Sequence, residues 1–336
     1  MGYARLIVFT CLIAVVFSNS TSTALNKRAS QFEEDLTVAL ADAILTFEGG
    51  IGEEQHLPAA SEIREFQPDS PEINDLRFHA QLCHTVNCRD SLNNWDCEEC
   101  LQILPDGEVL NYFKTAPHDI VGQIIRSKAL TNHDFERRKT VFVQIRGATS
   151  RTNKILTLDG RLVPYLPAPG GFVNSGCFQG FSEINQTMIT TISDQVELYP
   201  DYRVHVIGHS LGGCIASLAG LELLQRVHKL KSTKLSVYTL GKSRVGNQAF
   251  VDYHDSTGID HKRMVAKADA IAHQPPLSKG YLHEGVEYWM YDDNQHTKRC
   301  GGKESRSCSN SVVKRTSADH LLYYGTHEGC VGQDIV

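Results

Sequence analysis

A serine flanked by glycines stands between a strand-like run and a helix-like run in this chain. The run YRVHVIG (202–208) is rich in β-branched residues, and Leu211 to Val227 has apolar residues at helical spacing. Between them, the stretch GHSLG around Ser210 matches the pattern G-x-S-x-G. The five-residue pattern alone is weak, because a glycine-rich connection can contain serine by chance. Between a strand and a helix, however, it predicts a nucleophile elbow, a sharp turn that exposes a serine hydroxyl.

Strand-like and helix-like segments alternate on both sides of this turn. Further strands are predicted at TVFVQIRG (140–147), KLSVYTLG (234–241) and HKRMVAKAD (261–269), and a further helix at 183–199. Such alternation is typical of a mostly parallel, buried sheet flanked by helices. Ligand sites in such folds lie beyond the carboxyl ends of the strands. We therefore predict one α/β domain over residues 71–336, with Ser210 at its functional edge.

A serine nucleophile needs a base, and the base needs a group that orients it. In this fold class the expected chain order is serine, acid, histidine. Asp269 stands where the strand-like run 261–269 ends, whereas Asp255 and Asp260 precede that run. His320 follows a capping-type stretch, TSAD, and is preferred over four other downstream histidines, His273, His283, His296 and His327. The predicted triad is Ser210, Asp269 and His320.

The N-terminal part of the chain has the pattern of an export and processing region. Residues 1–24 have an early Arg5, a short apolar run and small residues before Ala24, which predicts a cleaved signal peptide. Residues 25–70 begin near a dibasic pair and hold ten acidic and three basic residues, which predicts an acidic pro-segment. This segment is interpreted as a solubilising leader, or as a folding aid or temporary inhibitor that packs on the domain that follows it. We expect a secreted, extracellular protein with no stable membrane insertion.

The chain has ten cysteines, which suits an oxidising compartment. Cys11 falls in the predicted signal peptide, so the remaining nine leave at least one thiol without a disulfide. Cys97 and Cys100 form a lone C-x-x-C, which favours a structural disulfide because a zinc site would want a second such pair. We expect no metal and no cofactor. The sequence also has no basic stripe with interleaved aromatics, so we expect no nucleic-acid partner.

Several blocks occur in the order and spacing of a known family: VIGHSLGG, YTLGKSRVGNQAF, KADAIAHQPP, YLHEGVEYWM, CSNSVV and DHLLYYG. From about Glu72 to Cys330 the chain resembles the secreted class 3 lipases of filamentous fungi, in particular the Rhizomucor miehei type. The resemblance implies an α/β-hydrolase fold with a short lid segment. It also implies Ser210 as nucleophile, Asp269 as acid and His320 as base, with an oxyanion hole formed by the backbone N–H groups of Ala148 and Leu211.

The resemblance also implies three disulfides, Cys88–Cys330, Cys97–Cys100 and Cys300–Cys308. It leaves Cys83, Cys177 and Cys214 outside the family pattern. Cys214 lies on a predicted buried helix, where a small inert hydrophobic side chain is expected. Cys83 and Cys177 are expected either to form a fourth bridge or to stay as buried thiols.

Four positions depart from the family pattern. Ala148 stands where the family has a hydroxyl residue beside the oxyanion hole, and Lys154 where similar lipases often place tryptophan in the lid. Phe178 and Ser243 replace a common histidine and proline, changes for which we favour harmless repacking. The polar lid predicts weak contact with a lipid–water interface and weak interfacial activation, because interfacial helices depend on buried apolar area.

Three functions are compatible with these observations. The first is a triacylglycerol or acylglycerol lipase that works through an acyl-enzyme on Ser210. The second is a soluble-ester or feruloyl-type esterase, and the third is a binding protein on a lipase scaffold that has lost catalysis. The intact triad argues against the third. We further expect a monomer, with an N-glycosylation sequon at Asn185 near the start of an exposed helix.

Overall fold

The structure, a computed structural model, describes residues 57–88, 94–127 and 139–327. The predicted signal peptide (1–24) and most of the predicted acidic segment (25–70) lie outside these residues. None of the helices in the described ranges is long and apolar enough to cross a membrane.

The main element of the described chain is a nine-stranded sheet in the order β1-β11-β10-β9-β8-β7-β4-β3-β2. Its central strands, β4, β7, β8, β9 and β10, pair in parallel, and the strands toward both edges pair antiparallel. The strand bounds are β1 Ile63–Phe66, β2 Gly107–Lys114, β3 Val121–Ser127, β4 Thr140–Ile145, β7 Arg203–His209, β8 Leu235–Leu240, β9 Asp260–Ala266, β10 Val286–Met290 and β11 Thr297–Cys300. Two short ribbons are formed by β5 Leu162–Pro164 with β6 Phe172–Asn174 and by β12 Leu322–Tyr323 with β13 Thr326–His327.

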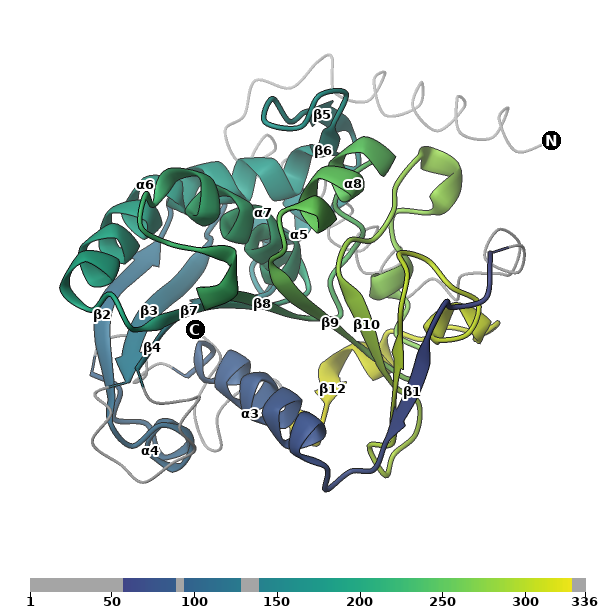
Figure 1. The fold of residues 1–336 in the computed structure, drawn as a ribbon, viewed down its shortest axis with the longest axis horizontal. Coiled ribbons are helices and arrows are strands. Elements are labelled where there is room, and N and C mark those ends of the chain that lie inside the picture. The colour runs from purple at the N-terminus through teal and green to yellow at the C-terminus, as the bar shows by residue number, and fades with distance from the viewer. Residues whose placement is uncertain (1–56, 89–93, 128–138, 328–336) are drawn as a thin grey trace, which may run out of the picture. The chain divides into compact units, whose positions relative to one another are not determined.

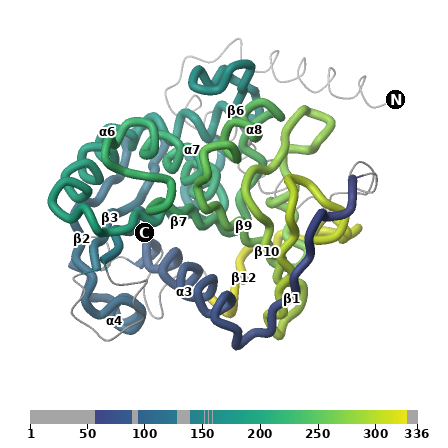
Figure 2. The backbone as a smooth tube through the Cα atoms, in the orientation of Figure 1, coloured from purple at the N-terminus to yellow at the C-terminus, as the bar shows by residue number. Residues whose placement is uncertain are grey.

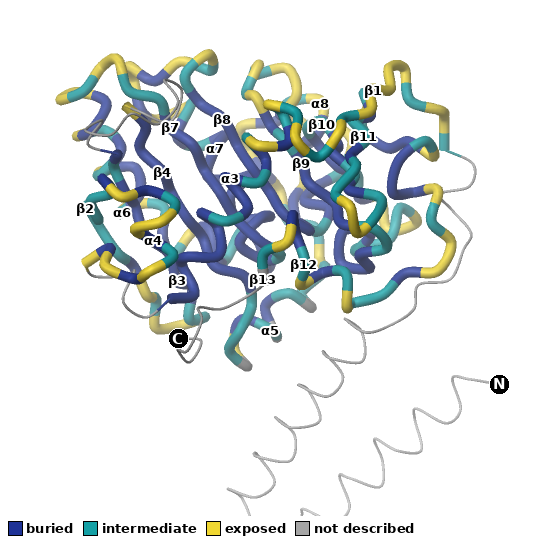
Figure 3. Tube along the Cα trace, turned by 90° about the horizontal axis from the view of Figure 1, so that it is seen from below, coloured by how far each residue is buried: buried dark blue, intermediate teal, exposed yellow. Residues whose placement is uncertain are grey.

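Helices cover both faces of the sheet (Figure 1). On one face lie α5 Arg151–Leu158, α6 Ser175–Leu198, α7 Leu211–Arg226 and α8 Gln248–Ser256, and on the other lies α3 Pro71–Thr85, with α4 Glu98–Ile103 near its end. Strand β7 contributes to both cores, because Val206 packs in the cluster with α6 and α7 while Ile207 packs in the cluster with α3. Every residue of β4 and β8 is buried, as the dark central strands in Figure 3 show. This two-sided burial explains why these strands are rich in apolar and β-branched residues and do not alternate between apolar and charged ones.

The arrangement confirms the predicted α/β-hydrolase fold. The predicted strands at 140–147, 202–208, 234–241 and 261–269 correspond to β4, β7, β8 and β9. The helix predicted at 183–199 begins earlier, at Ser175, where the Asn174 side chain caps it by accepting a hydrogen bond from the Cys177 N–H at 2.9 Å. The earlier start adds two turns to the helix that packs against α7.

Strand β1 joins distant parts of the chain. Ile63 to Phe66 pairs antiparallel with β11, and the N–H of Gly301 donates to the carbonyl of Glu62 at 2.9 Å. Figure 2 shows this purple N-terminal strand beside the light green strands from the C-terminal third of the chain. Although β1 falls within the range predicted for the acidic segment, it is an edge strand of the sheet.

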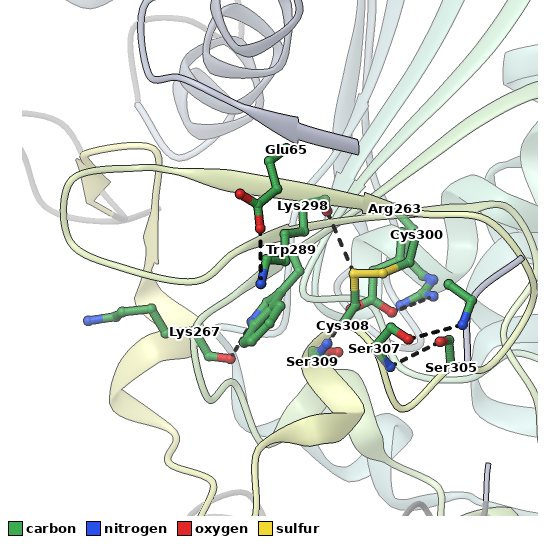
Figure 4. The surroundings of a disulfide bond; sticks show 12 residues. Glu65, Arg263, Lys267, Trp289, Lys298, Cys300, Ser305, Ser307, Cys308 and Ser309 are labelled. Carbon is green, nitrogen blue, oxygen red and sulfur yellow. Dashed lines mark hydrogen bonds and ion pairs between the residues drawn. A yellow bond between two sulfur atoms is a disulfide. The ribbon is translucent and has the colours of Figure 1, made fainter. Parts of the chain in front are cut away.

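Three disulfides join described cysteines. Cys97–Cys100 and Cys300–Cys308 are both bonded, the latter in the loop region of Figure 4 that also holds the Arg263 side chain. Cys88 is disulfide-bonded as well, while its predicted partner Cys330 lies outside the described residues. Cys83 is a buried thiol.

The third described disulfide joins Cys177 and Cys214, whose Cα atoms lie 5.8 Å apart. The prediction that Cys214 is an inert hydrophobic side chain is therefore wrong. The disulfide forms because α6 begins early, at Ser175. Cys177 therefore lies on α6, in the same core cluster as Cys214 of α7.

Candidate active site

Ser210 occupies the sharp turn between β7 and α7. Its backbone has φ 55° and ψ −122°, a conformation that side-chain-bearing residues rarely adopt. The turn is anchored by the Ser210 N–H, which donates to the carbonyl of Leu240 in β8 at 2.9 Å. Ser210 is partly exposed, while the residues on both sides of it are buried. The sequence therefore places a serine hydroxyl, held by a strained backbone, at the carboxyl end of the central strand.

The glycines on either side of Ser210 are required by close backbone approach. A Cβ on Gly208 would lie 2.1 Å from the carbonyl oxygen of Gly212, and a Cβ on Gly212 would lie 2.1 Å from that of Ile145. Real Cβ atoms do not approach backbone so closely. The G-x-S-x-G pattern thus reflects the packing of β7, α7 and β4 at this corner.

Asp269 and His320 are hydrogen-bonded to each other beside this turn. Asp269 follows β9 and is fully buried, and its Oδ2 lies 2.8 Å from His320 Nδ1. Its Oδ1 accepts a hydrogen bond from the Ile271 N–H at 2.8 Å. Burial alone would raise the pKa of Asp269, but the charge and hydrogen bond of His320, with the other donors, hold that pKa below its usual value. An ionised Asp269 fixes the His320 tautomer with its proton on Nδ1, which leaves Nε2 as the basic nitrogen.

His320 is tied to the nucleophile's neighbour. The ring of His209 lies 4.5 Å from that of His320 between centroids, and His209 Nε2 donates to the His320 carbonyl at 2.9 Å. His320 lies on a short 3-10 helix, Ala318–Leu321, that the loop after β11 brings over the strand ends. Residues 209, 269 and 320, from three separate stretches of chain, therefore meet at one edge of the sheet.

The structure places most rival residues elsewhere. Asp260 begins β9, at the opposite end of that strand from Asp269, and Asp255 accepts from the Gly285 N–H at 3.0 Å. His283 donates to the Ala272 carbonyl, and His296 pairs with Asp292. His273 Nδ1 donates to the Asp269 backbone carbonyl, and burial lowers the pKa of His273 to about 3. The fourth rival histidine, His327, is the last residue of β13.

Tyr323 is a site residue that the sequence did not reveal. Its hydroxyl donates to Asp269 Oδ2 at 2.5 Å, and the side chain is fully buried. Burial and the neighbouring Asp269 charge raise the pKa of Tyr323 well above its usual value, so the hydroxyl keeps its proton. The sequence feature that could have indicated this role is the position of Tyr323, three residues after His320 in the block DHLLYYG.

The loop after β4 lies against the nucleophile. A Cβ on Gly147 would lie 3.3 Å from the Ser210 Cβ, so Ala148 follows directly beside the turn. Ala148 is partly buried against the core. On the other side, Leu211 is the first residue of α7, whose first N–H groups have no partner within the helix. The two predicted oxyanion-hole residues are thus on the two segments that flank Ser210.

A cavity of about 190 Å³ opens beside Ser210 and Leu211. Its apolar walls include Ile271, Pro275 and Pro276, and the Cys177–Cys214 disulfide also lines it. Its remaining lining residues are polar or small: Thr157, Gly160, Asn174, Ser243, Gln274 and Lys279. The lining is thus partly apolar and partly polar, as is typical of small-molecule sites.

The predicted lid forms helix α5. Its N-cap is Ser150, whose hydroxyl accepts from the Asn153 N–H, and Asn153 Nδ2 donates to the Asp119 carbonyl at 3.2 Å. Leu156 is buried, whereas Lys154 is only partly buried. Thr157, on the same helix, lines the cavity beside Ser210. The helix that covers the site is thus short and largely polar.

The described residues include one group with the spacing of metal ligands, Cys88, Cys97 and Glu99. Both cysteines are disulfide-bonded, so neither sulfur offers a thiolate to a metal. The sequon residue Asn185 lies inside α6 rather than near its start, and its Oδ1 accepts from Arg226 at 3.1 Å. The predicted position of Asn185 near a helix start is therefore wrong, because α6 begins ten residues earlier.

Comparison with known proteins agrees with this geometry. Residues 142–279 match the family model described as lipase (class 3). The lipase of Rhizomucor miehei is 36% identical over 265 residues, which cover 77% of this chain and 70% of that protein. The chain spans about two thirds, 65%, of the length of the lipases of Rhizopus niveus and Rhizopus oryzae, to which it is 35% identical.

Solved structures are similar over most of the chain. The lipase of Rhizopus microsporus var. chinensis superposes with a TM-score of 0.74 and 37% identity, covering 85% of this chain and 97% of that one. A triacylglycerol lipase whose catalytic centre is described as a serine protease triad superposes with a TM-score of 0.73 and 36% identity, covering 80% of this chain and 99% of that one. The elbow, the buried Asp269–His320 pair and these similarities lead to one conclusion: the chain belongs to the class 3 lipase family.

Proposed function

We propose that this protein is a secreted serine carboxylic-ester hydrolase of the triacylglycerol lipase type. The observation that carries the proposal is the strained turn at Ser210 next to the hydrogen-bonded pair of Asp269 and His320. Within this family, a solved relative named as a triacylglycerol lipase has a catalytic centre of the same serine protease type. The proposed substrates are acylglycerols.

The chemistry follows from the geometry. Ser210 Oγ attacks the ester carbonyl carbon while His320 Nε2 takes the hydroxyl proton. The tetrahedral intermediate collapses with cleavage of the C–O bond, and His320 returns the proton to the leaving alcohol. Water, deprotonated by the same nitrogen, then hydrolyses the acyl-enzyme to release the acid and regenerate Ser210. Asp269 stays ionised throughout and stabilises the His320 cation.

The oxyanion of each tetrahedral intermediate needs donors already in place. We assign the Leu211 N–H, at the positive end of α7, and the Ala148 N–H, in the loop after β4. Both belong to backbone segments that the close packing around Gly147 and Gly212 holds in position. The alanine at 148 supplies its backbone donor without a supporting hydroxyl.

A second candidate, an esterase for soluble or aromatic esters, is favoured by the lid. Among the α5 residues whose burial is described, Thr152, Lys154 and Thr157 are partly or fully exposed, while the apolar Leu156 is buried, and interfacial binding depends on exposed apolar area. The chemistry at Ser210 is the same for both candidates, and they differ in the alcohol and acyl groups that the pocket accepts.

Covalent labelling with an organophosphate, with Ser210→Ala as the control, tests the nucleophile. We expect one equivalent of label on Ser210 of the purified mature protein and none on the variant. A panel of emulsified triacylglycerols and aromatic esters then separates the two candidates. An unlabelled and inactive protein would instead support a binding role on a lipase scaffold.

Secretion is proposed from two features. The predicted signal peptide at residues 1–24 is the first, and the disulfides of the described chain are the second, since disulfides persist in oxidising compartments. N-terminal sequencing of the exported protein would locate the mature start. Retention of residues 1–24 on the exported protein would contradict the proposal.

A further inference from the structure

A disulfide forms part of the wall of the cavity beside Ser210. Cys177 and Cys214 both line this cavity together with Ser210 itself. Cys214 is four residues after Ser210, and its N–H donates to the Ser210 carbonyl at 3.3 Å, so it lies one helical turn further along the same face of α7. The disulfide therefore lies next to Ser210 along α7, one helical turn away.

The two cysteines have little room to adjust. Cys177 is 3% exposed and Cys214 0%, and each lies in a helix of the main core cluster. The covalent bond fixes the separation of the first turn of α6 from the first turn of α7. An ordinary pair of apolar side chains could change rotamer to admit a longer acyl chain, whereas a disulfide allows only small movements.

The first turn of α6 also supports the lid. The Ser175 N–H donates to the Arg161 carbonyl at 2.8 Å, just beyond α5. A Cβ on Gly176 would lie 2.1 Å from the carbonyl oxygen of Leu156, so helix α5 rests directly on this turn. The disulfide thus holds the turn on which α5 packs, and Thr157 of α5 lines the same cavity.

The cavity is small for a ligand site. Its volume of about 190 Å³ is below the range of roughly 300 to 1,000 Å³ typical of small-molecule sites. Removing the two sulfur atoms would extend the cavity along α7, because Gly213, which shares this helix face with Ser210 and Cys214, has no side chain to fill the space. The bulk of the disulfide is therefore placed where the end of an acyl chain would lie.

We propose that the Cys177–Cys214 disulfide determines acyl-chain specificity by closing the acyl-binding pocket one helical turn from Ser210. The proposal rests on the ester hydrolase activity proposed above. It assigns a role in limiting the depth of the acyl pocket to a bond formed by two cysteines outside the family pattern.

The test compares kcat/KM on p-nitrophenyl esters of increasing linear acyl length, from acetyl to lauroyl, for the wild type and Cys177→Ala/Cys214→Ala. We expect the long-to-short ratio of kcat/KM to rise at least about tenfold in the variant, since one or two methylenes in an apolar pocket change discrimination by that order. A purely structural role would lower both values together and leave the ratio unchanged.

Two further variants complete the test. Cys300→Ala/Cys308→Ala removes a disulfide that does not line the cavity, and we expect its ratio to match the wild type. If the alanine pair at 177 and 214 does not fold, Cys177→Ala/Cys214→Val keeps more of the core bulk and is expected to shift the ratio in the same direction. If the wild type is active and the folded 177/214 variant has the same long-to-short ratio of kcat/KM, this proposal is overturned. An inactive wild type overturns the proposed function instead.

Discussion

At the scale of single residues, the most informative side chain is Tyr323. It gives buried Asp269 a third hydrogen bond beside those from His320 and the Ile271 N–H. We expect Tyr323→Phe to lower the free energy of unfolding by about 1.5 to 3 kcal/mol, the range for a hydrogen bond to a charged group. It should also raise the pKa of Asp269; the more basic carboxylate then stabilises the His320 cation better, so the acid limb of the kcat/KM profile moves to higher pH.

Tyr324→Phe is the matched control, because its buried hydroxyl bonds to Thr297 rather than to Asp269. We expect it to affect stability without moving the pH profile. An unchanged profile in Tyr323→Phe would show that Tyr323 does not position the acid. Denaturant unfolding and pH–rate curves measure both effects.

Ala148 gives a second prediction at this scale. Adding a hydroxyl with Ala148→Ser supplies the support that the family pattern places beside the oxyanion hole. We expect kcat on a short-chain ester to rise by up to about tenfold, less than the 100- to 1,000-fold value of a complete donor. Ala148→Val adds bulk without a hydroxyl and should not raise the rate. A lower kcat in Ala148→Ser would contradict the role given to this loop.

At the scale of elements, we propose that helix α5 governs how the protein contacts a lipid surface. Lys154 is partly exposed on this helix, so Lys154→Trp adds apolar area where the lid faces solvent. We expect the wild type to show no sharp rise in activity as substrate passes from dissolved to emulsified. In Lys154→Trp, activity should rise about tenfold on emulsification, the effect expected from burying one large apolar side chain in the lipid surface.

Lys229→Trp is the control for that experiment, since Lys229 is exposed beyond the end of α7 and pairs with Glu197. We expect it to leave the response to emulsion unchanged. A sharp rise already present in the wild type would contradict the prediction of weak interfacial activation.

At the scale of the whole molecule, two fully buried ion pairs link the segments behind the active site. Arg244 pairs with Glu304 at 2.8 Å and Lys242 with Glu284 at 2.7 Å. Burial alone would raise the pKa of each carboxyl group, but the paired cation lowers it to about 2. Because these pKa values are depressed, the stabilisation is complete above about pH 4.5 and is lost as the pH falls toward 2.

Glu304→Gln tests this acid dependence. We expect it to lower the free energy of unfolding at pH 7 by about 3 to 5 kcal/mol, because it leaves Arg244 charged and buried without its partner. The difference from the wild type should shrink as the pH falls toward 2. Glu197→Gln, which breaks an exposed pair, should change little at any pH. A pH-independent difference for Glu304→Gln, measured by urea unfolding, would refute the assignment.

The sequence predicted the elements that are regular and buried. Strands β4, β7 and β8 were identifiable because they are buried on both faces and rich in β-branched residues, whereas β9 alternates more weakly and has four polar residues before Met264. The Cys177–Cys214 disulfide was not identifiable, since the pairing of cysteines depends on which helices lie side by side and not on their spacing along the chain. The role of Tyr323 was equally hidden, because its hydrogen bond to Asp269 spans 54 residues and exists only in the folded domain.

Strand β1 has a practical consequence for producing this protein. An expression product that starts at residue 71 would lack the partner of β11, whose amide and carbonyl groups would then line an open sheet edge. Open edges of this kind recruit strands from other molecules. Recombinant versions that retain residues from Leu57 onward are therefore the ones to prefer for crystallisation or assay, and aggregation of shorter ones would reflect the missing strand rather than a fault in the catalytic core.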